Sequence, residues 1–332
     1  MLLLLLACSG DAEAPPTPLD RGQNAAWMRR QWIHGGPEVA GHEAALRQAL
    51  AENARALGIT AVYPFLGPMD ADGHPGWRGD RGVIQRYDPA TAEAFFRDME
   101  RLAPELAVIP WTGGNWRQDV VFGDTPRLAG FAAHAAAITR LGADGVQLNV
   151  EPLPSWTPGY LALLADVKAA IGPDKVLSVA AYPPPTPLHP FPDVHWELPF
   201  LAEVCRVADD LAVMGYDTGI TLRWRYRGLM EDWTRALAET LPPPEAGGCT
   251  WRMGLPAYED DEPWHHPDVE TVDEAIRGVR AGLGPEPPSN FLGVAVYASW
   301  TTDADEWAAY EQLWRARAPS GAALPDRELP AP

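Results

Sequence analysis

Short apolar runs alternate with helical patterns eight times along the 332-residue chain, and no other feature constrains its fold as strongly. This alternation is typical of βα units arranged around a parallel sheet. Eight such units fit one closed barrel better than an open doubly wound sheet, which usually has fewer strands and a glycine-rich phosphate turn. We therefore predict an α/β protein that forms a single (β/α)8 TIM barrel. The predicted strands cover residues 31–34, 60–65, 107–111, 145–151, 176–182, 211–217, 252–258 and 292–300.

The barrel is expected to span residues 26–318 as one domain, because no linker and no repeat of constant period appears inside residues 30–318. The last residues, 319–332, are expected to form an irregular tail.

The N-terminus has the pattern of a targeting segment. An apolar run over residues 2–6 precedes Ala7 and Cys8, and it is far too short to span a bilayer as a helix. The run resembles the end of a bacterial lipoprotein signal, although no Lys or Arg precedes it. The resemblance implies a signal remnant over residues 1–8, lipidation of Cys8 and a flexible tether over residues 9–25. It places the protein at the bacterial cell envelope, anchored by lipid on the periplasmic or outer surface; a chance leucine run is the alternative.

The charge balance restricts the partners. Lys and Arg number 26 against 45 Asp and Glu, which gives a formal net charge of -19. This field repels phosphate backbones and anionic headgroups, so we expect no nucleic-acid partner and no membrane contact except through Cys8.

No motif for a cofactor or a metal is present. The sequence contains no GxGxxG, no Walker-type loop and no GxSxG elbow, and we expect no cofactor. His265 and His266 are adjacent, lack HExxH spacing and lie among prolines and acids, which favours a surface position over a metal site. Two cysteines, Cys205 and Cys249, are predicted near the bottom of the barrel, where they form a disulfide or remain free buried thiols.

The fourth predicted strand carries a polar face. With a period of two, Val146, Leu148 and Val150 fall on one face, and Gln147, Asn149 and Glu151 on the other. The apolar face suits the surrounding helices, so the polar face points into the barrel, where an unpaired polar group costs about 1–3 kcal/mol. Packing does not explain three such residues in a row, and barrel enzymes place their chemistry at the C-terminal ends of the strands. Glu151 is therefore the candidate for chemistry.

This segment, DGVQLNVEP, resembles the DxxDxDxE signature of the family 18 glycoside hydrolases, the chitinases and endo-N-acetylglucosaminidases. Asp144 and Glu151 match the first and last positions, while Gln147 and Asn149 stand where the inner aspartates would be. Four further segments are similar to the family's motifs in the same order: VIPWTGG (108–114), VMGYD (213–217), GLPAY (254–258) and Trp300.

The resemblance implies substrate-assisted retaining hydrolysis of a glycan that contains N-acetylglucosamine, in which the substrate's 2-acetamido group attacks the anomeric carbon. Glu151 would be the general acid and then the base, with a raised pKa. Tyr216 would bind the acetamido oxygen, Asp217 would line the same subsite and Trp300 would form its floor. Asn149 lacks the charge of the family's Asp but can bind the acetamido group through its amide. The other expected substrate contacts are Gln147, Asp144, Trp111, Gly113, Gly114, Tyr258 and Glu259.

Two alternatives remain open from the residues. Glu259 directly follows Tyr258, so a retaining glycosidase could use Glu151 and Glu259, given about 5–5.5 Å between their carboxyls. The neutral Gln147 and Asn149 also fit a catalytically weak or inactive barrel that binds glycan. Stacking platforms are expected among the loop aromatics Trp77, Trp116 and Trp156, and His34 could contact substrate or be a satisfied core histidine.

Overall fold

A computed structural model describes residues 19–79, 82–187 and 189–328. The expected lipidation residue, Cys8, and the first part of the tether lie outside these residues. The described strands form a closed parallel barrel, because β1 pairs with both β11 and β2. Its strands are β1 (Asn24–Met28), β2 (Ile59–Pro68), β5 (Ala107–Val108) with β6 (Trp111–Asn115), β7 (Gly145–Glu151), β8 (Val176–Ala181), β9 (Asp210–Val213), β10 (Thr250–Pro256) and β11 (Phe291–Tyr297). The predicted TIM barrel is thus confirmed.

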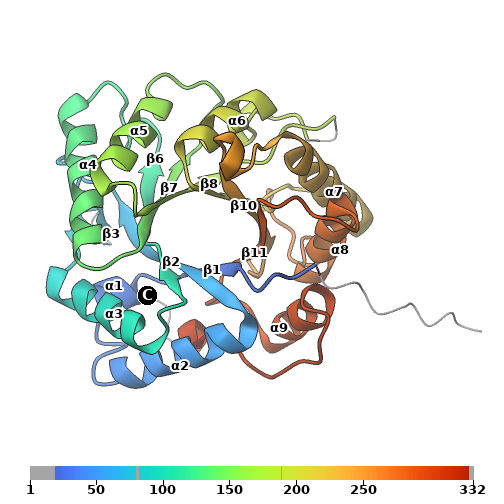
Figure 1. Cartoon of the computed structure of the whole chain (residues 1–332), viewed down its shortest axis with the longest axis horizontal. Helices are drawn as coiled ribbons and strands as arrows, with labels where there is room; N and C mark the ends of the chain where they lie inside the picture. Colours follow the sequence, from blue (N-terminus) through green and yellow to red (C-terminus); the bar gives the residue numbers. More distant parts are fainter. Residues whose placement is uncertain (1–18, 80–81, 188, 329–332) are drawn as a thin grey trace, which may run out of the picture.

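Helices surround the ring of strands (Figure 1). Among the described helices, none has the length and apolar character needed to cross a membrane. The helices are α1 (Gln31–His34), α2 (Glu43–Leu57), α3 (Pro89–Leu102), α4 (Thr125–Arg140), α5 (Tyr160–Ile171), α6 (Leu198–Val207), α7 (Arg223–Thr240), α8 (Val272–Leu283) and α9 (Ala304–Ala309), which continues into a π-turn at Tyr310–Trp314. A short antiparallel hairpin, β3 (Gly76–Arg78) and β4 (Ile84–Arg86), follows β2.

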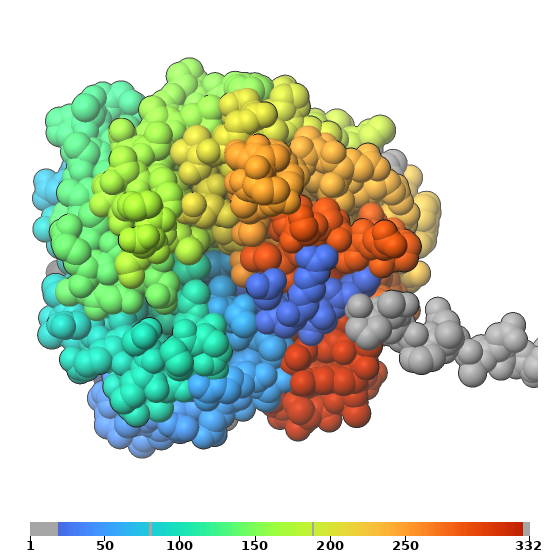
Figure 2. Space-filling model, in the orientation of Figure 1, coloured from blue at the N-terminus to red at the C-terminus, as the bar shows by residue number. Residues whose placement is uncertain are grey.

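The first strand lies earlier than predicted. Residues 31–34 form α1, whereas the strand is NAAWM at Asn24–Met28, and all five of its residues are buried. A strand buried on both faces has no alternating pattern, so the periodicity gave no signal there. The tether is also shorter than predicted, because Leu19 is buried and Arg21 donates to the carbonyl oxygen of Phe291. In the space-filling view the N-terminal segment, coloured blue, lies against the orange and red C-terminal part of the chain (Figure 2).

The third strand is divided. Pro110 has no N–H for the ladder, and β5 and β6 flank it with separate pairings to β2.

The C-terminal tail, which was predicted to be irregular, is packed against the barrel. Its described part includes a 3-10 turn, Pro325–Glu328. Asp326 is fully buried and accepts hydrogen bonds from the Arg29 backbone N–H (2.9 Å), Trp32 Nε1 (2.6 Å) and Ser299 Oγ (2.8 Å). The tail therefore supplies a hydrogen-bonding partner inside the fold.

A disulfide joins Cys205 of α6 to Cys249, just before β10, with 5.0 Å between their Cα atoms. It links two neighbouring units at the N-terminal ends of the strands. Of the two alternatives left open by the sequence, the structure therefore contains the bonded pair.

Candidate active site

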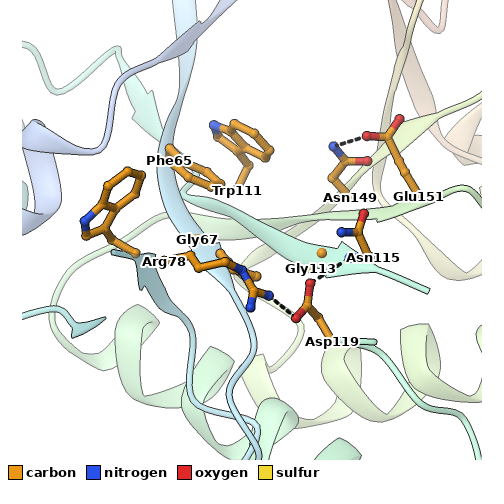
Figure 3. A pocket seen from close by; sticks show the side chains of 12 residues that line it. Phe65, Gly67, Arg78, Trp111, Gly113, Asn115, Asp119, Asn149 and Glu151 are labelled. Carbon is orange, nitrogen blue, oxygen red and sulfur yellow. Dashed lines mark hydrogen bonds and ion pairs between the residues drawn. The ribbon is translucent and has the colours of Figure 1, made fainter. Parts of the chain in front are cut away.

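Glu151 is the last residue of β7, in the mouth of the barrel. Its strand is paired with β6, where Asn115 lies opposite Glu151. The Glu151 side chain lines two cavities, of about 280 Å³ and about 180 Å³. Figure 3 shows the carboxyl beside Asn149 at the edge of the larger of these cavities. The strand-end position predicted from the sequence therefore opens to a space that can hold a ligand.

The surroundings of Glu151 favour its protonated form. Burial raises the pKa of Glu151, hydrogen bonds from Asn149 and Tyr182 lower it by less, and the charge of Asp217 raises it further. The Asn149 amide nitrogen lies 3.2 Å from Glu151 Oε2. A carboxylic acid with a raised pKa is suited to donating a proton near neutral pH.

Tyr216 and Asp217 follow β9, which β8 separates from β7, and they line the smaller cavity together with Glu151. The ring of Tyr216 stacks on Tyr297 with centroids 4.8 Å apart. Tyr258 donates its hydroxyl to Asp217 Oδ1. Four of the predicted residues, Glu151, Tyr216, Asp217 and Tyr258, are thus close together in the structure.

The larger cavity has aromatic walls and two glycines at its base. Trp111 packs on Phe65 with centroids 4.2 Å apart, and Trp77 of the β3–β4 hairpin also lines the space (Figure 3). A Cβ on Gly113 would lie 1.9 Å from the backbone oxygen of Asn149, and one on Gly114 would lie 2.7 Å from Asp119 Oδ2. Both glycines have positive φ; Gly113 allows the close approach of β6 to β7, and Gly114 allows that of Asp119 in the loop after β6.

Solved structures with this architecture were found by structural comparison. No family model matches the sequence, and no curated protein sequence does. The spore cortex-lytic enzyme SleL of Bacillus megaterium QM B1551 aligns with a TM-score of 0.56 at 10% identity, over 90% of this chain and 76% of that one. The Group IV chitinase of Ostrinia furnacalis aligns with a TM-score of 0.54 at 12% identity, over 90% and 97% of the two chains. A GH18 chitinase from Pseudoalteromonas aurantia gives 0.51 at 14%, over 83% and 93%.

The chain has the TIM-barrel fold that these chitinases and SleL share. At these identities the likeness shows the fold alone, so the roles of the residues depend on the geometry of this chain.

Two predicted contact residues lie away from the mouth of the barrel. Asp144 precedes β7, at the opposite end from Glu151, and accepts a hydrogen bond from the Val108 backbone N–H at 2.8 Å. Gln147 is fully buried inside the barrel, where Oε1 accepts from Trp27 Nε1 (2.7 Å) and Nε2 donates to Ser178 Oγ (3.1 Å). Both side chains therefore have structural partners in place of the expected substrate.

Glu259 is also separated from Glu151. It is exposed and lies with Asp303 and Glu306, whose carboxylate oxygens are all within 4.8 Å of one another and of its own. It lines neither of the two cavities that Glu151 lines. The arrangement does not favour a pair of catalytic carboxyls formed by Glu151 and Glu259.

The aromatic that stacks on Tyr216 is Tyr297, the last residue of β11, whereas Trp300 was expected to form the floor of the subsite. Trp300 lies further out, in a third cavity of about 280 Å³ that it shares with Asp217 and Tyr258, and its ring contacts Tyr297 edge-on at 5.8 Å. The strand ends three residues earlier than predicted, which moves the aromatic position from Trp300 to Tyr297.

The remaining candidates have mixed outcomes. His34 Nε2 lies 2.9 Å from the Leu66 carbonyl oxygen, and burial lowers the pKa of His34 to about 4, which fits the satisfied core histidine. Trp156 is exposed and donates Nε1 to Glu197, while Trp116 packs under the Arg117 guanidinium. His265 is fully buried, which contradicts its predicted surface position.

Sequence reasoning missed Tyr182 and Tyr297. Both directly follow or end a strand, so the rule that led to Glu151 could have found them once the strand ends were known.

Proposed function

We propose that the protein is a glycoside hydrolase that cleaves glycans containing N-acetylglucosamine by a substrate-assisted retaining mechanism. The observation that carries the proposal is the position of Glu151, an acid with a raised pKa between two cavities, facing Tyr216 and Asp217. The aromatic walls of the larger cavity suit the flat apolar faces of sugar rings.

In the first step the acetamido carbonyl oxygen bonds to the anomeric carbon while the bond to the leaving oxygen breaks, and Glu151 transfers its proton to that oxygen. In the second step Glu151, now a carboxylate, takes a proton from water as the water oxygen bonds to the anomeric carbon and the oxazolinium ring opens. The same residue acts as acid and then as base, so no protein nucleophile is needed.

Asn149 supports this scheme with both ends of its amide. Its nitrogen donates to Glu151, while its buried Oδ1 has no hydrogen-bonding partner among the described residues. A buried acceptor without a donor costs about 1–3 kcal/mol, and the N–H of an acetamido group would satisfy it. This favours a substrate with an amide at C2 over a simple hexose.

A glycan-binding barrel with little or no turnover is the second candidate. The observation that favours it is the neutral inner face of β7, where Gln147 and Asn149 supply no charge to a developing cation.

Hydrolysis of N-acetyl-chitooligosaccharides and peptidoglycan fragments, by the unmodified protein and by Glu151→Gln, tests the proposal. We expect the variant to lose at least 100-fold in kcat and to retain binding, since general acid–base catalysis contributes about 10²–10⁴-fold. Turnover that is unaffected by the change would remove Glu151 from the mechanism. Binding without turnover in the unmodified protein would support the second candidate.

We also propose that Cys8 anchors the protein to the cell envelope. Labelled fatty acid should be incorporated by the unmodified protein in a bacterial host and not by Cys8→Ser; equal labelling of both would refute the anchor.

A further inference from the structure

His265 lies in the loop between β10 and α8 and lines the third cavity together with Asp217 and Tyr258. Its side chain has no exposed surface, and its ring stacks on Tyr258 with centroids 3.8 Å apart and 19° between the planes. Tyr258 in turn donates its hydroxyl to Asp217. One buried ring therefore supports a residue pair of the proposed site.

Both ring nitrogens of His265 face oxygen atoms. Nε2 lies 3.2 Å from the backbone oxygen of Tyr258. Nδ1 forms no hydrogen bond among the described residues, but it lies 3.4 Å from Glu270 Oε2, which is also buried without one, and 3.9 Å from Asp217 Oδ1. A carbonyl and an ionised carboxylate can only accept, so this geometry is satisfied when both nitrogens carry a proton, which makes the ring an imidazolium ion.

The electrostatics agree with that state. Burial by itself lowers the pKa of His265, but the contact with Glu270 and its charge, followed by the Tyr258 carbonyl and Asp217, raise it above its ordinary value. Asp260 and Glu262 line the same cavity, whereas His266 contacts Asp261 instead. No Lys or Arg is among the described residues that line this cavity, so His265 is its only cationic side chain.

Glu270 is fixed to the loop that carries Asp217. Its buried Oε1 accepts from both the backbone N–H (3.0 Å) and the hydroxyl (2.8 Å) of Thr218, the next residue after Asp217. The Glu270 carboxylate thus joins the loop after β10, which also carries His265, to the loop after β9, which carries Asp217.

We propose that His265 is a positioning residue: a buried imidazolium, held by Glu270, that keeps Asp217 ionised and oriented toward the mouth of the barrel. It acts through Asp217 and Tyr258 and does not itself contact the sugar. The effect of His265 on turnover rests on the proposed function. The charge of His265 and its contact with Asp217 can be tested without that function.

The charge of Asp217 then bears on Glu151. Burial and then the charge of Glu270 raise the pKa of Asp217, and Tyr258 and His265 oppose this rise; ionised Asp217 in turn raises the pKa of Glu151. In this way His265 would separate the two acids, with Asp217 charged while Glu151 holds its proton.

The charge of His265 can be measured directly by NMR on protein with ¹⁵N-labelled histidine, with its signals assigned through His265→Gln. We expect both ring nitrogens to be protonated at pH 7, and Glu270→Gln to move the titration of His265 to lower pH. A neutral ring in the unmodified protein at pH 7 would overturn the proposal.

The hold on Asp217 is measured by titrating its ¹³C-labelled carboxyl group, assigned through Asp217→Asn. In His265→Gln we expect the pKa of Asp217 to rise by about one unit or more, since an opposite charge within 4–6 Å shifts a carboxyl by about 1–3 units. The neighbouring change His266→Gln is the matched control and should leave Asp217 unaffected. Equal titration of Asp217 in the two variants contradicts the proposal.

The pH dependence of hydrolysis is a further measurement, and it can be made only if the proposed function is correct. The acid limb of the pH–kcat profile should move to higher pH in His265→Gln and stay in place in His266→Gln. If the unmodified protein hydrolyses nothing, the proposed function fails while the NMR measurements still decide the role of His265. If His265→Gln does not fold, the titration of His265 in Glu270→Gln decides it, and an unchanged titration counts against the proposal.

Discussion

Asn149 donates its side-chain amide to Glu151 Oε2 over 3.2 Å, two residues away on the same face of β7. A neutral amide therefore holds the proposed catalytic acid, at a position where an aspartate would supply both a hydrogen bond and a charge. The Asn149 amide provides the hydrogen bond but no charge, so the site lacks a negative charge at this position.

Asn149→Asp should raise kcat on acetamido substrates by about tenfold, because a charge-assisted contact to the oxazolinium ion is stronger than a neutral one and each 1.36 kcal/mol changes a rate tenfold. The measurement is kcat across pH 4 to 9. Gln118→Glu is the control, since it adds the same charge at an exposed position in the loop after β6. An unchanged or lower kcat in Asn149→Asp would show that charge at this position does not limit turnover.

Glu151 should cost the protein stability at alkaline pH. The folded-state pKa of Glu151 is raised, so its stabilising contribution is complete below the unfolded pKa and is lost as the pH rises through the folded value. Glu151→Gln, which cannot ionise, should therefore have a Tm a few degrees higher than the unmodified protein at pH 8 and an equal Tm near pH 4.

Thermal unfolding followed by circular dichroism at the two pH values measures this difference. The exposed change Glu239→Gln removes the same charge from α7 and should give no such pH dependence. A Tm gain for Glu151→Gln that is the same at both pH values would contradict burial of the charge as the cause.

Strands with alternating polar and apolar residues, such as β7, could be predicted from the sequence. β1 has no such alternation and could not. β7 spans Gly145–Glu151 as predicted, because its polar and apolar faces differ. β1 is buried on all sides, and its five residues carry no period. Propensity and periodicity describe one face at a time, so a strand with two covered faces gives no contrast.

The same limit applies to the site. Glu151 follows from the rule that strand ends meet at the barrel mouth, whereas Tyr216 and Asp217 came from the resemblance of VMGYD to the family's motif. His265 could not be predicted, because its loop has the composition of a solvated acidic segment, and its burial depends on contacts with Tyr258 and Glu270 formed when this loop folds back on itself. Trp300 was placed on the floor because the end of β11 was predicted three residues too late.

Gln147→Glu should destabilise the fold strongly. The carboxylate would replace the amide that donates to Ser178, and Ser178 already donates to Asp210, the partner of Arg252. A second buried acid without a cation of its own costs about 3–5 kcal/mol. The loss should be large at pH 7 and smaller at pH 4, where the new acid takes up a proton.

Urea unfolding at both pH values provides the measurement, with the exposed change Gln85→Glu as control. If Gln147→Glu is as stable as the control at pH 7, the buried hydrogen bonds around residue 147 tolerate a negative charge. The presence of a neutral residue at this position then has another cause.

Reduction of the Cys205–Cys249 disulfide should lower stability without altering the site. The bond closes a loop with a sequence separation of 44, for which the chain-entropy model gives about 4 kcal/mol. It lies at the N-terminal ends of the strands, whereas Glu151 is at the C-terminal ends, so the geometry around Glu151 does not depend on it. The double change Cys205→Ala and Cys249→Ala should therefore lower the urea midpoint substantially while kcat and KM at 20 °C stay within about twofold. Unchanged stability in this variant would show that loss of the disulfide adds little conformational entropy to the unfolded chain. A large loss of kcat in the folded variant would show that the two ends of the barrel are coupled.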